Sequence, residues 1–143
     1  MIYFLKVVFK DCCGENVKNN IYRIIGIQNN RSLSSFAKII VSSFGFNFDH
    51  CYGFYDNLNR PFDSKEMYEL FTDIGEEPTE GALGVEHVRI SRVFDSVGKK
   101  LLFLFDYGDN WYFTVELLEI KKIGDRVKYP KVIKRVGRTP KQY

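Results

Sequence analysis

One stretch of this chain, residues 32–45, restricts the possible folds most strongly because its apolar side chains recur at helical spacing. Ser32 can cap the first turn with its hydroxyl, and Gly45 stands where helices commonly end in a left-handed conformation. The apolar positions between them form one broad face, which consists of Leu33, Phe36, Ala37, Ile40, Val41 and Phe44. A face of that kind is buried against another element. We therefore predict an amphipathic helix packed on a sheet.

The segments around this helix are rich in β-branched and aromatic residues, which is typical of strands. Met1 to Lys10 and Ile21 to Ile27 precede the helix and predict an antiparallel hairpin. A short helix is expected at Met67 to Phe71 and a helical turn over residues 90–98. Further strands are predicted at residues 51–55, 101–105, 111–120 and, as a weak edge strand, 131–136.

This order predicts an α+β fold, in which an N-terminal β-hairpin is followed by a helix packed on a mixed or antiparallel sheet. The start is ubiquitin-like, similar to a β-grasp. With 143 residues, of which 45% are hydrophobic, the chain can bury the core of a single domain, residues 1–143. We expect a loop insertion at about residues 56–90 and a basic C-terminal tail at residues 121–143.

The charge of the chain is unevenly distributed. Residues 121–143 contain nine basic groups and one acid, whereas the whole chain carries a net charge of only +3. Such asymmetry indicates an anionic partner or a tail that folds back on an acidic face. No recognition-helix pattern accompanies these cations, so sequence-specific readout of DNA is not expected. The candidate residues for binding an anion or a nucleic acid are Lys128, Lys131, Lys134, Arg135 and Arg138.

The three cysteines are a poor disulfide framework, because two of them, Cys12 and Cys13, are adjacent and the count is odd. They indicate free thiols and a reducing cytoplasm. Together with His50 they would supply four zinc ligands, but the two Cys-x-x-Cys knuckles of a zinc ribbon are missing. We predict no metal and no cofactor. The apolar N-terminus is too short for a signal peptide, and no apolar run is long enough to span a membrane.

The sequence FDYGDNW, residues 105–111, has two interpretations. As a tight turn, Gly108 would take a positive φ, an aspartate would accept bonds from nearby backbone amides, and Trp111 would be a packing anchor. As a chemical site, Asp106 and Asp109 would face one another and bind a cation or act as an acid/base pair. We favour the turn, since Gly-Asp turns between apolar strands are common.

Arg23 stands between apolar residues of a predicted strand and could reach a carboxylate such as Asp106 or Asp109. That contact would be either a structural clamp or the anion-binding end of a ligand pocket. The candidate pocket residues are Arg23, His50, Tyr52, Asp106, Asp109 and Trp111.

Several short motifs, taken in order, resemble those of a known family. They are Tyr22-Arg23-Ile24-Ile25, Ser32-Leu33, Phe44-Gly45-Phe46, His50 with Tyr52, the segment from Phe105 to Phe113, and Tyr129-Pro130. This pattern resembles the family named after open reading frame 3 of plasmid pRiA4b, over nearly the whole chain. The resemblance implies a fold similar to the one predicted above and no established activity. Phe113 replaces a histidine of the family pattern, and the usual acidic, proline-rich C-terminal stretch is reduced to Thr139-Pro140.

Three functions remain open. We favour a small binding or interaction module without catalytic activity, because the chain contains no nucleophile elbow, phosphate loop or dinucleotide fingerprint. Catalytic residues are therefore not assigned. The second hypothesis is a nucleic-acid-associated protein that uses the basic tail. The third is a hydrolase or metal-dependent enzyme centred on His50, Asp106 and Asp109, which requires these side chains to converge. A protein or a nucleic acid is the partner expected, and no membrane.

Overall fold

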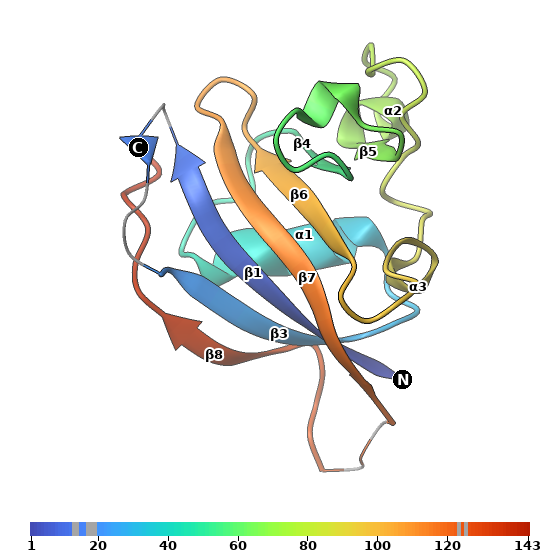
Figure 1. Cartoon of the computed structure of the whole chain (residues 1–143), viewed down its shortest axis with the longest axis vertical. Coiled ribbons are helices and arrows are strands. Elements are labelled where there is room, and N and C mark those ends of the chain that lie inside the picture. Colours follow the sequence, from blue (N-terminus) through green and yellow to red (C-terminus); the bar gives the residue numbers. More distant parts are fainter. Residues whose placement is uncertain (13–14, 17–19, 123, 125) are drawn as a thin grey trace.

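A single antiparallel sheet forms the body of the molecule (Figure 1). The computed structural model describes residues 1–12, 15–16, 20–122, 124 and 126–143. The strands follow the order β5-β4-β6-β7-β1-β3-β8, and β2 pairs with the end of β1. Their bounds are Ile2–Cys12 for β1, Glu15–Asn16 for β2, Tyr22–Gln28 for β3, Tyr52–Tyr55 for β4, Met67–Glu69 for β5, Lys100–Phe105 for β6, Trp111–Lys121 for β7 and Lys131–Val136 for β8.

One long helix, α1 (Leu33–Ser43), packs against one face of this sheet, and Figure 1 shows it behind the strands. The Ser32 side chain accepts a hydrogen bond of 3.0 Å from the Ser35 amide, which confirms the predicted cap. The apolar face predicted from the sequence is buried in the core. The other helices are single turns, η1 (Pro61–Asp63), α2 (Leu70–Asp73) and α3 (Ile90–Val93).

The two faces of the sheet differ in how they are covered. Alternate residues of β1, such as Leu5 and Val7, are buried in the core beneath α1. On the opposite face, a smaller apolar cluster around Tyr55 and Leu104 lies over β4 and β6 and includes Leu58 from the segment after β4. On β1 and β3 of that face, side chains such as Lys6 are only half-buried. The sheet therefore has one covered face and one partly open face.

The predicted fold class is wrong. The protein is sheet-rich, and every pairing between its named strands is antiparallel. It does not have the ubiquitin-like start that the sequence suggested, although α1 covers one face of the sheet. The reason lies in the later strands. The hairpin of β6 and β7 pairs with β1, and β8 adds to β3, so β1 becomes an inner strand of a wide sheet and not part of a small grasp.

One smaller expectation needs correction. The helix predicted at residues 67–71 is strand β5 followed by the single turn α2. Met67 to Glu69 pair with the free edge of β4, and this tertiary pairing overrides the local helical signal. By contrast, β8 has the bounds predicted for the weak edge strand, and Gly45 takes the expected positive φ of 79°.

A basic cleft at the end of helix α1

The C-terminus of α1 leaves one carbonyl for side chains to bind. After the helix, the Gly45 amide donates to the Ser42 carbonyl at 2.9 Å and the Phe46 amide donates to the Val41 carbonyl at 3.1 Å. This pattern closes the helix because Gly45 is left-handed. It leaves the Ser43 carbonyl for other donors, at the negative end of the helix dipole.

Two arginines donate to this carbonyl. Nε of Arg23, on β3, donates at 2.8 Å, and Nη1 of Arg135, on β8, donates at 3.0 Å. The two residues are paired in the sheet register, so their side chains leave the same face toward α1. Arg23 is 6% exposed, and its guanidinium lies 4.5 Å from the centroid of the Phe44 ring. The sheet and the helix end thus fix both guanidinium groups.

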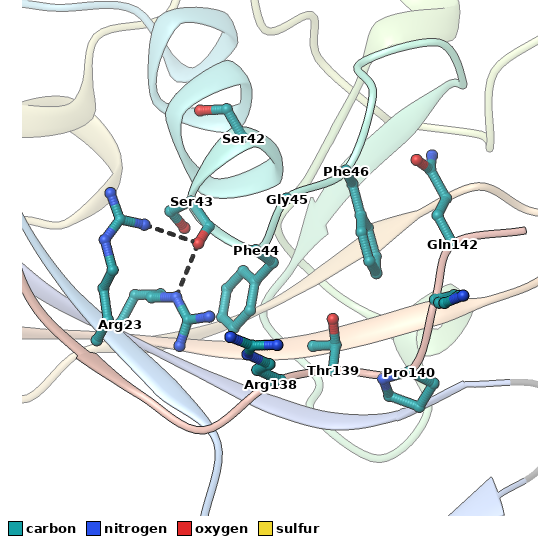
Figure 2. A pocket seen from close by; sticks show the side chains of 12 residues that line it. Arg23, Ser42, Ser43, Phe44, Gly45, Phe46, Arg138, Thr139, Pro140 and Gln142 are labelled. Carbon is teal, nitrogen blue, oxygen red and sulfur yellow. Dashed lines mark hydrogen bonds between the residues drawn. The ribbon is translucent and has the colours of Figure 1, made fainter.

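These residues form one wall of a cleft of about 430 Å³, which we call the arginine cleft (Figure 2). The opposite wall is the segment after β8. Figure 2 shows Arg138, Thr139, Pro140 and Gln142 facing the end of α1 across the cleft. The full lining consists of Arg23, Ser42, Ser43, Phe44, Gly45, Phe46, Arg135, Arg138, Thr139, Pro140, Lys141 and Gln142.

The arginine cleft is strongly basic. Three arginines and Lys141 line it, and no aspartate or glutamate does. Within the described parts of the chain, none of these four cations forms an ion pair. The pKa of Arg23 is lowered by burial and, secondarily, by the nearby charge of Arg135. The guanidinium groups of Arg23 and Arg135 are therefore held next to each other by a backbone carbonyl and not by a carboxylate.

Arg23 does not make the carboxylate contact expected from the sequence. Besides Ser43, its guanidinium donates to the carbonyls of Tyr22, Val136 and Gly137, at distances between 2.9 and 3.0 Å. Asp106 and Asp109 are not among its partners in the described structure. These bonds attach the end of β8, and with it the far wall of the cleft, to β3.

Asp106 and His50 form a separate polar cluster. His50 Nε2 lies 3.4 Å from a carboxylate oxygen of Asp106 and 3.5 Å from one of Asp49. The Tyr143 hydroxyl donates to Asp49 and lies 3.4 Å from the same histidine nitrogen. Gln142 links this cluster to the arginine cleft, because it lines the cleft and its side-chain amide donates to Asp49 at 3.2 Å.

The sequence FDYGDNW forms a turn around the Asp106 carboxylate. One of its oxygens, Oδ1, accepts bonds from the amides of Gly108 at 3.0 Å and Asp109 at 3.3 Å. The prediction that Gly108 takes a positive φ is wrong. Asp106 and Asn110 take it instead, with φ of 66° and 57°. A Cβ at position 108 would lie 3.3 Å from Asp106 Oδ1, so glycine gives that carboxylate room to turn inward.

The remaining predicted pocket residues are buried in the core. Trp111 is 1% exposed and packs against Phe46 at 4.5 Å and Phe9 at 5.7 Å between ring centroids. Tyr52 contacts Phe48, and burial raises the pKa of its hydroxyl. Neither residue lines the arginine cleft, although Trp111 supports Phe46, which does.

The predicted anion-binding residues separate onto two faces. Arg135 and Arg138 line the arginine cleft, whereas Lys131 and Lys134 pair with Gly26 and Ile24 on the opposite face of the sheet. Lys128 is exposed in the connection before β8. Sequence reasoning had Arg23 in one group and the two arginines in another. It missed that the Ser43 carbonyl joins Arg23 to Arg135 and that Arg138 lines the same cleft, and the only local signal was the helix end at Phe44-Gly45-Phe46.

No metal centre is formed by the residues that the structure describes, taking three or more His, Cys, Asp or Glu side chains as the minimum. Cys51 is a free thiol. The Cys12 side chain and Cys13, which the four-ligand zinc count required, lie outside the described residues. Over the same residues, no helix is long and apolar enough to cross a membrane.

Comparison with known proteins identifies the family and the fold. No curated protein matches the chain. A crystal structure of a protein of unknown function from Methanosarcina mazei Go1 superposes with a TM-score of 0.73 at 20% sequence identity, covering 94% of this chain and 68% of that one. At this identity the likeness extends to the fold alone. The model of a sequence family matches residues 3–142, and the chain therefore belongs to the plasmid pRiA4b ORF-3-like protein family.

Proposed function

We propose that the protein is a non-catalytic, cytoplasmic binding module whose ligand places an anionic group in the arginine cleft. The observation that carries this proposal is the convergence of Arg23, Arg135 and Arg138 on one cleft without a carboxylate to neutralise them. Guanidinium groups bind phosphate and carboxylate oxygens through paired N–H donors. Burial and, secondarily, repulsion by Arg135 lower the pKa of Arg23, and a bound anion would relieve that repulsion.

The hydrogen bonds of the cleft leave donors for such a ligand. Nη1 of Arg135 and Nε of Arg23 are occupied by the Ser43 carbonyl. Among the described contacts, the second terminal nitrogen of each guanidinium donates to no protein acceptor, and neither does any nitrogen of Arg138. The bonds that exist therefore orient the groups, while the remaining N–H donors are directed to solvent or to a ligand.

A hydrolase centred on His50, Asp106 and Asp109 receives less support. His50 and Asp106 are neighbours, but one Asp106 oxygen is held by two backbone amides of its own turn. His50 Nε2 faces two carboxylates and the Tyr143 hydroxyl. None of the three side chains lines the arginine cleft, the cavity between Lys10 and Thr114, or the cavity between Asp56 and Lys65.

Isothermal titration calorimetry with inorganic phosphate at low ionic strength tests the proposal. We expect the wild-type protein to bind phosphate and Arg138→Gln to bind it about tenfold more weakly, since a hydrogen bond to a charged group contributes ~1.5–3 kcal/mol. The matched control is Arg60→Gln, which removes an exposed guanidinium that lies in the connection after β4 and does not line the cleft. Absence of phosphate, sulfate and acetate binding in the wild type, or equal loss in both variants, would refute an anion site in this cleft.

A further inference from the structure

The open face of the sheet, opposite the arginine cleft, carries a second and independent set of basic and aromatic residues. We infer that this face, over β7, β1, β3 and β8, binds single-stranded nucleic acid. The strand register places Phe4 and Lys6 of β1 on it, together with Tyr22 of β3. These residues are half-buried, and α1 lies on the other side of the sheet (Figure 1).

Aromatic rings on this face are bracketed by ammonium groups. Nζ of Lys6 lies 4.4 Å from the centroid of the Tyr22 ring, and Nζ of Lys134 lies 5.7 Å from it. Nζ of Lys121 lies 5.6 Å from the Phe4 ring. A base that stacks on Tyr22 would therefore bring its phosphate within reach of lysines that are already there. Stacking on aromatic rings combined with backbone neutralisation is how proteins bind single strands without reading their sequence.

A third ring extends the row toward the edge strand. Tyr129 packs edge-on against Phe4, with 6.0 Å between ring centroids. It lies directly over Gly26, where an added Cβ would come within 2.7 Å of the Tyr129 ring. The glycine thus leaves the space that the Tyr129 ring occupies beside Phe4. Lys131, which pairs with Gly26 on β8, adds a further cation at this position.

The charge of this face favours a polyanion over an acidic or neutral patch on another protein. Lys6, Lys121, Lys131 and Lys134 lie on these four strands, and the described acids of the same face are Asp11, Glu116 and Glu119, of which Glu119 pairs with Lys121 at 3.6 Å. Lysine is a flexible point charge that suits phosphates without fixed geometry. A duplex hides the faces of its bases, so the rings select a single strand.

Fluorescence anisotropy with a labelled oligothymidylate of about 20 nucleotides tests this inference. The Lys6→Gln/Lys134→Gln double variant is expected to bind about tenfold more weakly at about 50 mM salt. Its slope of log affinity against log salt should fall by about 1.4, since each phosphate contact to a single strand contributes ~0.7. Lys38→Gln/Lys65→Gln is the matched control, because both lysines are exposed and lie outside these four strands.

Substitutions at Tyr22 distinguish the contribution of base stacking to the affinity from the contribution of the lysine charges. Tyr22→Leu should weaken binding at least fivefold, in line with ~1–3 kcal/mol per stacked base, whereas Tyr22→Phe keeps the ring and should bind like the wild type. If Tyr22→Leu does not fold, the two lysine variants decide alone. The inference is overturned if the wild type shows no salt-dependent binding, if a duplex of equal length binds as tightly, or if only Arg138→Gln lowers the affinity. A stable dimer, detected by light scattering, would also overturn it if the dimer interface covers this face.

Discussion

Two charged sites of this protein differ in how far the fold itself satisfies their hydrogen bonds. Glu69, on β5, is fully buried, and its carboxylate accepts bonds from the Tyr55 hydroxyl and from the amide and hydroxyl of Thr79. In the arginine cleft, Arg23 and Arg135 share one carbonyl, and Arg138 has no protein partner within the described structure. A charged group whose hydrogen bonds are supplied by the protein itself has a structural role, whereas a cluster of charges with unused donors at a cleft is suited to bind a ligand.

The largest effect is expected from Glu69→Ala. The change leaves the buried Tyr55 hydroxyl and the Thr79 donors without an acceptor and opens a cavity, so the free energy of unfolding should fall by about 3–4 kcal/mol. Urea denaturation monitored by circular dichroism measures it. Glu80→Ala, an exposed acid of the same segment, serves as the control and should stay within about 0.5 kcal/mol of the wild type. A loss at Glu69 no larger than the control would show that its network is not structural.

Gly53→Ala should destabilise the protein by about 1–3 kcal/mol through crowding. A Cβ there would lie 2.7 Å from the Tyr107 hydroxyl and 2.8 Å from that of Tyr55, and these two hydroxyls are themselves hydrogen-bonded at 2.7 Å. Tyr107→Phe removes one of the clashing oxygens. A double-mutant cycle should therefore recover part of the loss, and strict additivity of the two changes would contradict the proposed clash.

In the arginine cleft, by contrast, we expect loss of a charged side chain to weaken ligand binding and to leave the free energy of unfolding almost unchanged. Arg138→Gln should change the free energy of unfolding by less than about 0.5 kcal/mol, because its side chain makes no described hydrogen bond. Phosphate at about ten times its dissociation constant should stabilise the wild type by ~1.4 kcal/mol and the variant much less. Thermal unfolding with and without phosphate tests both statements. A variant that is strongly destabilised without any anion would make Arg138 a structural residue like Glu69.

This contrast also shows which features of the fold and of the cleft could be predicted from the sequence. Periodicity and caps predicted α1 correctly, because Ser32, Gly45 and the apolar face act within one element. The arginine cleft depends on pairing Arg23 with Arg135 across 112 positions of chain, which local patterns do not encode. Glu69 was expected in a helix and lies in β5, because an edge of β4 was available to it. The same missing information, the order of strands, caused the error in fold class.

The smallest effect concerns the segment that closes the arginine cleft. The Tyr143 hydroxyl donates to Asp49, and this bond, with the nearby negative charges of Asp49, Asp106 and Asp109, raises the pKa of Tyr143 to about 12. Because the folded value is raised, the contact is fully formed below the ordinary tyrosine pKa near ~10 and is lost as the pH rises through about 12.

Ultraviolet difference titration of the wild type against Tyr143→Phe isolates this one phenol among nine tyrosines. We expect the difference to titrate near 12 and the overall stability to stay almost unchanged, since Tyr143 is exposed. Asp49→Asn should return the titration toward the ordinary value, because it removes the negative acceptor. If the difference titrates at the ordinary value in the wild type as well, the C-terminal segment is not held to Asp49 in solution. The wall of the cleft would then have to be ordered by the ligand itself, and phosphate binding would carry that extra cost.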